Sequence, residues 1–321
     1  MNILKNLYSI NSTSDLLVLK FGLFISLTFA FVFLALLLGS TIFSLVHFSK
    51  AKTNNDNTIF AFSKFVSGLV TKMWFRFLLG FLPMLGSVFF FTQLYAEKIP
   101  SAPSAMLIAF ILFLLGLCII LIYKNLYKTE NVNEITNTFL PTLAWLGIGL
   151  ISVSSFILVA YLQASILGNK EGFFAILFSP SAILYFFLFV SLSFGLTSGV
   201  IIAVLNRTNE GIYKSYARYF STYSGLIFSF LHPLLFVLIV LSTPVNSLSF
   251  LYFGISALVL LLMLLTAIQF YYSYKNSKAK TTSIVFLFVL LISFLVYSTN
   301  ISSEVASKKE MLQKHRVELF S

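Results

Sequence analysis

The side chains that could bind a metal or move a proton are few in this sequence. Among its 321 residues are three histidines, ten acidic residues and one cysteine. Imidazole nitrogens are common axial ligands of haem iron, and carboxylates inside membrane helices mark proton and ion pathways. The chemistry open to this chain therefore depends on where these few residues lie along it.

The three histidines fall at different predicted depths in the membrane. His232, in the segment SFLHPLLF, lies near the middle of an apolar helix, His47 lies at the end of another, and His315 lies in the charged C-terminal segment. No two of them can clamp one haem between them. We predict His232 and His47 as the positions where haem b or a quinone would be contacted. The alternative is that His232 hydrogen-bonds a neighbouring helix and that His47 has an interfacial role.

Acidic residues are absent from every predicted membrane span. A charge at the bilayer centre costs about 2.5–3.5 kcal/mol on insertion scales, so membrane proteins keep one there chiefly for a pathway or relay. Proton or ion translocation by this chain alone is therefore not expected. Cys118 is a single cysteine in an apolar run, which leaves neither a metal motif nor the CxxCH motif that attaches haem c. No catalytic signature for hydrolysis or nucleotide binding is present, and we expect no catalysis by the chain on its own.

These residues are positioned by membrane helices. The sequence is 59% hydrophobic and 10% charged, with a mean hydropathy of +0.96, which no soluble fold of this length could accommodate. Eight apolar runs are long enough to cross a bilayer: 21–46, 74–95, 105–123, 139–166, 182–205, 223–241, 249–272 and 283–299. We predict an all-α bundle of eight transmembrane helices over residues 1–301, followed by a short tail over 302–321.

Basic residues predict the orientation of this bundle. The connections after spans one, three, five and seven carry thirteen Lys and Arg residues, whereas those after spans two, four and six carry only Lys98 and Lys170. Cytoplasmic connections are enriched in Lys and Arg. Both termini are therefore expected outside the cytoplasm. The formal charge of +11 does not indicate nucleic-acid binding, because the basic residues are spread between apolar runs.

Three further sequence patterns concern an interfacial helix, a close helix contact and internal repetition. Residues 58–72 have apolar positions at helical spacing, which predicts an amphipathic helix at the cytoplasmic interface or an extension of the second span. Ser191, Gly195 and Gly199 recur every four residues and predict a close helix contact. No internal repeat is visible between the two halves of the sequence.

Part of the sequence resembles a family of bacterial membrane domains. The segments LTFAFVFLALLLGS (27–40), GFLPMLGSVFFFTQLY (80–95) and IYKNLYK (122–128) are similar to eight-helix domains that precede c-type cytochrome domains in membrane-bound cytochromes. The resemblance implies an outward C-terminus joined or docked to a cytochrome. The family tends to carry a histidine in the middle of the first helix, where this chain has Phe29, Phe31, Val32 and Phe33. A cytochrome would therefore be a separate partner or a part beyond this polypeptide.

These observations favour a non-catalytic membrane subunit. It would anchor an extracytoplasmic, cytochrome-like electron-transfer partner in a hetero-oligomeric respiratory complex, with residues 302–321 as an amphipathic docking helix or a frayed terminus. One alternative is a transporter or channel for an uncharged or lipid-like substrate, lined by Gln163, Ser193 and Gln269. Another is a structural subunit of a larger membrane assembly.

Overall fold

The computed structural model describes residues 13–70, 76–126, 139–167, 172–207, 212–276 and 282–320, and these are helical apart from short turns and connections. The prediction of an all-α integral membrane protein with eight spans is confirmed, because eight helices are long and apolar enough to cross a bilayer. They are α2 (Thr13–Asn54), α5 (Leu82–Tyr95) with the π-helical turn η1 (Phe77–Phe81) before it, α6 (Ala102–Asn125), α7 (Leu140–Leu167), α9 (Pro180–Leu205), α10 (Lys214–Ser242), α11 (Phe250–Lys275) and α12 (Thr282–Phe320). Three short elements join them: α3 (Asn57–Gly68), α8 (Phe173–Leu177) and the 3-10 turn η3 (Val245–Ser247).

The eight spans form two four-helix halves with the same pattern of contacts. In the first half, α2 contacts α5, α5 contacts α6, α6 contacts α7, and α7 returns to α2. In the second half, α9, α10, α11 and α12 contact one another in the same cyclic order. Spans one and five run in the same direction, so this is a parallel relation rather than an inverted one. The halves thus share an arrangement that the sequence does not show as a repeat.

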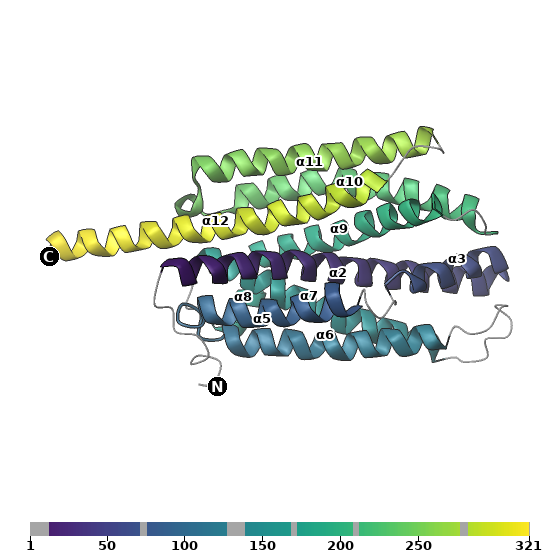
Figure 1. Cartoon of the computed structure of the whole chain (residues 1–321), viewed down its shortest axis with the longest axis horizontal. Coiled ribbons are helices and arrows are strands. Elements are labelled where there is room, and N and C mark those ends of the chain that lie inside the picture. The colour runs from purple at the N-terminus through teal and green to yellow at the C-terminus, as the bar shows by residue number, and fades with distance from the viewer. Residues whose placement is uncertain are drawn as a thin grey trace.

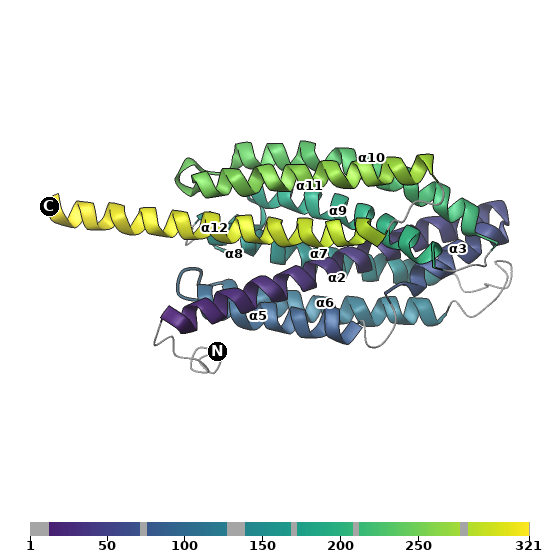
Figure 2. The same cartoon turned by 45° about the horizontal axis from the view of Figure 1, so that its top comes forward.

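The centre of the molecule is made by the first and last helix of each half. All four of these helices, α2, α7, α9 and α12, contact one another, while α5 with α6 and α10 with α11 lie on the outside (Figures 1 and 2). In the most apolar 18-residue stretch of each span, 72% of the residues are buried in α9 and 67% in α2. The corresponding fraction is only 33% in α6 and in α10. The outer helices therefore present most of their apolar surface to lipid.

Close contact between the halves depends on small residues. A Cβ on Gly39 of α2 would lie 2.3 Å from the Thr197 hydroxyl and 2.5 Å from the Ser193 carbonyl oxygen, so α2 and α9 meet backbone against backbone. On the other side of α9, a Cβ on Gly195 would lie 2.7 Å from the Phe288 ring of α12. A Cβ on Gly199 would lie 2.7 Å from Ile284. The glycines of the predicted small-residue stripe therefore lie in a packing seam.

Helix α3 folds back along the end of α2. Its N-cap is Asp56, whose carboxylate accepts hydrogen bonds from the backbone N–H groups of Thr58 (2.7 Å) and Ile59 (3.2 Å). The Ser63 hydroxyl of α3 donates to the Ser44 carbonyl of α2 at 2.6 Å. The predicted amphipathic helix is present, but it lies antiparallel to α2. It ends as a separate element before η1, and residues 71 and 72 of the predicted segment lie outside the described part.

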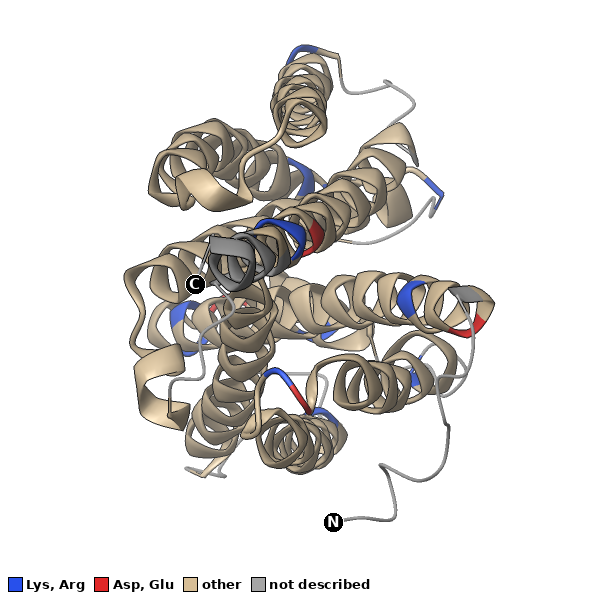
Figure 3. Ribbon diagram, turned by 90° about the vertical axis from the view of Figure 1, so that its left-hand side faces the viewer, with Lys and Arg blue, Asp and Glu red and all other residues tan. Residues whose placement is uncertain are grey.

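The start of α2 and the end of α12 lie at the same end of the bundle, as alternating spans require (Figure 1). Helix α12 continues past the other helices at this end, in both side views (Figures 1 and 2). Seen from this end, most of the ribbon is neither acidic nor basic, and the charged positions are scattered over several helices and connections (Figure 3). Acidic and basic positions adjoin on the helix that ends at C (Figure 3). Which side of the membrane this end faces remains the prediction made from the basic residues.

Candidate functional site

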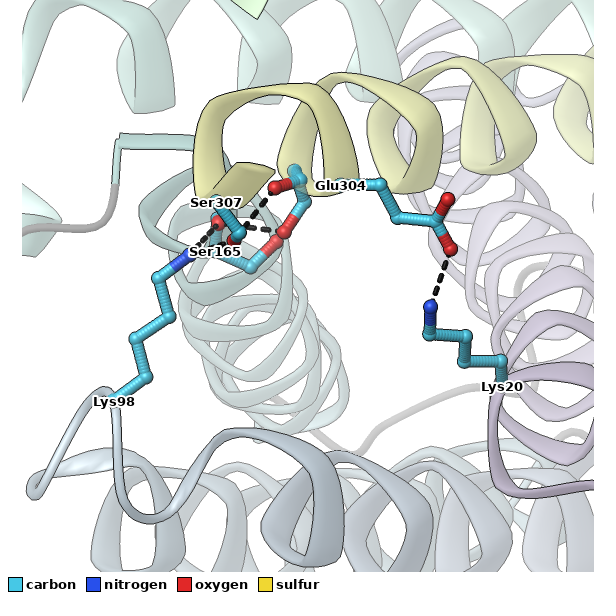
Figure 4. Close-up of polar contacts among 6 residues, drawn as sticks. Lys20, Lys98, Ser165, Glu304 and Ser307 are labelled. Atoms are coloured by element: carbon cyan, nitrogen blue, oxygen red, sulfur yellow. Dashed lines mark hydrogen bonds and ion pairs between the residues drawn. The ribbon is translucent and has the colours of Figure 1, made fainter. Parts of the chain in front are cut away.

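The segment where α12 leaves the bundle is held by side chains from several elements. The Ser303 hydroxyl donates to the Ser165 carbonyl of α7 at 2.7 Å. The ammonium group of Lys98, in the connection between α5 and α6, donates to the Ser307 hydroxyl at 2.7 Å and to the same Ser165 carbonyl at 3.3 Å (Figure 4). These bonds satisfy a carbonyl near the C-terminus of α7 and connect α12 to the first half of the molecule.

A second set of contacts fixes α12 from its other side. Glu304 forms an ion pair with Lys20 near the start of α2 (Figure 4). Lys309 donates to the Leu248 carbonyl, just before α11, at 3.3 Å. The Lys20 and Glu304 side chains are 42% and 45% exposed, and exposed pairs contribute about 0–1 kcal/mol, so this pair specifies position more than stability. Residues 303–309 are thus held by both halves, and α12 stays helical from this base to Phe320.

His47 lies in an aromatic enclosure between α2, α3 and α10. It is 2% exposed, and its Nδ1 atom is 2.7 Å from the Phe43 carbonyl oxygen one helical turn earlier. The rings of Phe220 and Phe62 lie edge-on, with centroids 4.3 and 4.8 Å from that of the imidazole. Tyr216 lies at 5.8 Å in the same edge-on manner. The arrangement packs the returning α3 and the start of α10 against α2.

His232 belongs to α10 and packs against α9 and α12. It is 0% exposed, and neither ring nitrogen has a hydrogen-bond partner of acceptable geometry. The backbone of Ser191 lies near the ring without meeting that geometry. The Phe288 ring is edge-on at a centroid distance of 5.8 Å, and a Cβ on Gly195 would lie 2.9 Å from the imidazole Cε1 atom. The predicted hydrogen bond from His232 to a neighbouring helix would be to this Ser191 backbone of α9, and it stays a prediction.

The two histidines are not brought together. His47 packs on Phe220, which is twelve residues before His232 on α10, or roughly 18 Å along a helix. In the described residues no group of three or more His, Cys, Asp or Glu side chains could hold a metal ion. Aromatic rings pack edge-on against both imidazoles, and Gly195 lies against that of His232. A cofactor contact at His47 or His232 stays a prediction, and the side chain of His315 lies outside the described part.

A small cavity of about 50 Å³ lies where the four central helices meet. Tyr185 of α9 hydrogen-bonds there with Gln163 of α7 and Thr299 of α12. The Gln163 side-chain nitrogen is buried without a partner. Gln269, by contrast, accepts a bond from Ser283 at 3.4 Å in an exposed contact, and Ser193 bonds its own helix. The three residues proposed to line a transport pathway therefore do not share a cavity, and the cavity itself has room for a few waters at most.

A larger groove of about 910 Å³ runs beside the base of α12. We call it the α2–α12 groove. It is lined by Leu17, Lys20, Phe21, Leu23, Phe24, Tyr95, Ser249, Leu251, Leu290, Ser293, Phe294, Tyr297, Asn300, Ile301, Glu304, Val305 and Lys308. Sequence reasoning missed both this groove and the Tyr185 network, because each is formed by residues from helices far apart in the chain. The one available signal was the placement of Lys20 and Glu304 at the ends of two apolar runs.

Comparison with solved structures identifies the fold. The chain matches a chain of the bd oxidase from Geobacillus thermodenitrificans with a TM-score of 0.65 and 10% sequence identity, covering 92% of this chain and 88% of that one. No protein-family model matches the sequence, and no curated protein matches it. The chain is therefore a multi-pass membrane protein with the fold of a respiratory oxidase chain.

This result corrects the family resemblance drawn from the sequence. The expected likeness to membrane domains that precede c-type cytochrome domains is wrong, because the fold matches a bd oxidase chain over nearly its whole length. The segments behind that expectation are mostly Phe, Leu and Gly, which any lipid-exposed bundle needs in its spans and helix contacts. Such segments report a membrane helix and do not separate one family of bundles from another.

Proposed function

We propose that this chain is a non-catalytic membrane subunit of a respiratory oxidase-type complex. It would hold a cofactor-carrying partner subunit in the bilayer and contribute no redox group of its own. The observation that carries the proposal is the match to a chain of a bd oxidase over 92% of this chain and 88% of that one. With so much of both chains aligned, the role of an oxidase subunit is the most economical function for this fold.

The placement of polar residues supports a structural role. The described part of the chain holds no cluster of metal-ligating side chains, and both buried histidines are enclosed by packed rings or glycine backbone. The central cavity is confined to about 50 Å³. Residues arranged in this way can hold helices in register.

The projecting part of α12 is the docking element in this proposal. Residues 303–309 are held by α2, α7 and two connections, so the helix beyond them has a defined direction. Beyond this base, the eleven residues 310–320 extend the helix by roughly 16 Å. We infer that this helix meets a partner subunit on the extracytoplasmic side, where the distribution of basic residues would place it.

The proposal is tested by purifying the full chain from its native membrane under mild conditions. We expect a co-purifying partner subunit and a haem absorption spectrum that follows the partner. A variant ending at Lys309 keeps every contact that holds residues 303–309, so the bundle should stay folded. The amount of partner subunit that co-purifies with it should fall at least tenfold. Purification with no redox-active partner would overturn the proposed function, and full retention by the truncated variant would overturn the docking role of α12.

A further inference from the structure

The α2–α12 groove differs in polarity from one end to the other. Its deep part is formed by apolar side chains, among them Leu23, Phe24, Leu290 and Phe294. The part nearest the end of the bundle holds Lys20, Asn300, Glu304 and Lys308. This gradient follows the membrane normal, because α2 and α12 both run along it. A ligand that matches the groove has an apolar tail directed into the bilayer and a polar head at its surface.

The mouth of the groove is open to the lipid side. Leu17 is 69% exposed, Phe21 60%, Leu251 55% and Tyr297 42%. These large apolar and aromatic side chains surround a hollow of about 910 Å³, within the size range of binding pockets for whole small molecules. A lipid acyl chain can enter from the bilayer without crossing a polar barrier.

The polar end of the groove carries an excess of positive charge. Lys20 and Lys308 line it together with one acid, Glu304, and Glu304 is paired with Lys20. Lys308 is exposed and has no ion-pair or hydrogen-bond partner among the described residues. An ammonium group at the membrane surface attracts an anionic lipid headgroup, by about 1 kcal/mol per Lys. The groove therefore selects a headgroup with a net negative charge.

Asn300, at the polar end of the groove, favours a ligand that carries hydrogen-bond donors. The side-chain oxygen of Asn300 is buried and has no partner. Because a buried acceptor left without a donor is costly, a ligand that supplies a hydroxyl would relieve it. Phosphatidylglycerol carries both a phosphate for the lysines and glycerol hydroxyls for Asn300.

We propose that the α2–α12 groove binds one molecule of phosphatidylglycerol. The phosphate accepts hydrogen bonds from Lys308 and from the remaining protons of Lys20, a glycerol hydroxyl donates to Asn300, and the acyl chains lie along Phe24 and Phe294. The lipid then contacts both halves of the bundle beside the base of α12. An isoprenoid quinone has a similar tail, but its neutral head would leave the charge of Lys308 unmatched.

The test compares two neighbouring lysines. The full chain is placed in nanodiscs containing equal amounts of phosphatidylglycerol and phosphatidylethanolamine, and retained lipids are counted by native mass spectrometry. We expect one retained phosphatidylglycerol. Lys308→Gln should lower its retention about fivefold, whereas Lys309→Gln, which changes a lysine that bonds the Leu248 carbonyl and does not line the groove, should leave it unchanged.

A third variant tests the headgroup hydroxyls. Asn300→Leu should lower the preference for phosphatidylglycerol over phosphatidic acid, which lacks the glycerol head, by at least threefold. Equal retention by the Lys308 and Lys309 variants would overturn the proposal. So would retention of phosphatidylethanolamine, of a quinone or of no lipid at all. None of these outcomes depends on a partner subunit, so the lipid site and the proposed function can fail separately.

Discussion

The two four-helix halves share an arrangement but differ in how they treat buried polar groups. In the first half, buried hydroxyls reach across helices to partners. Ser44 lies 3.3 Å from the Ser63 hydroxyl and 3.2 Å from that of Tyr123, joining α2, α3 and α6. Ser154 of α7 donates to the Ala109 carbonyl of α6 at 2.8 Å. These bonds connect neighbouring helices in a medium that offers no water in exchange.

The second half leaves many buried polar atoms without partners. In its described residues these include both ring nitrogens of His232 and the side-chain oxygens of Ser191, Thr197, Ser198, Ser221, Ser229, Ser256, Ser273, Asn300 and Ser302. The first half has four such atoms in the residues that the structure describes, on Thr28, Arg76, Thr92 and Gln163. An unpaired polar atom costs about 1–3 kcal/mol by mutational measures. The first half therefore leaves fewer buried polar atoms unpaired, while the second carries polarity that packing within the chain does not explain.

The largest expected effect comes from the contact between the halves. Gly39→Ala would put a methyl group within 2.5 Å of the Ser193 carbonyl oxygen, so α2 and α9 must separate. We expect a loss of about 2–3 kcal/mol, typical of overpacking in a tight core. The matched control is Gly149→Ala in α7, where an added Cβ meets nothing within 4 Å. Thermal unfolding of the purified protein in detergent measures both, and an equal effect of the two variants would show that the halves do not meet as closely as described.

His232 tests the unexplained polarity of the second half. His232→Leu removes two buried ring nitrogens that make no well-aligned hydrogen bond, so we expect stability to rise by about 1 kcal/mol if the imidazole only packs. A fall in stability together with an altered haem or quinone spectrum in the purified complex would instead show that the imidazole contacts a cofactor. The same unfolding assay, combined with an absorption spectrum, separates these results.

The smallest effect is expected in the first half. Ser44→Ala removes a hydroxyl that faces both Ser63 and Tyr123. Hydrogen bonds between membrane helices average about 0.6 kcal/mol, so a loss of about that size is expected. The opposite signs for Ser44 and His232 would confirm the contrast between the halves. An increase in stability on Ser44→Ala would contradict this contrast between the halves.

Much of the fold could be predicted from the sequence because each membrane span is specified by the apolar residues of its own segment. A run such as 182–205 is apolar throughout, and the structure has helix α9 at Pro180–Leu205. The stripe of Ser191, Gly195 and Gly199 predicted close packing for the same reason, since small residues are needed wherever backbones approach. The candidate site was predicted less well. Gln163, Ser193 and Gln269 were grouped by polarity, but polarity does not specify which helices are neighbours.

The sequence by itself determined the eight helical spans and the absence of acids from the apolar runs within them. It could do so because the exclusion of charge and of unpaired backbone from lipid acts on each segment separately. Only the tertiary structure decided that α2, α7, α9 and α12 form the centre, that α3 folds back on α2, and that Lys20 and Lys98 hold the base of α12. These features depend on which side chains fit together between helices. An apolar run by itself could pack against many different helices, and only the close packing of all eight selects its neighbours.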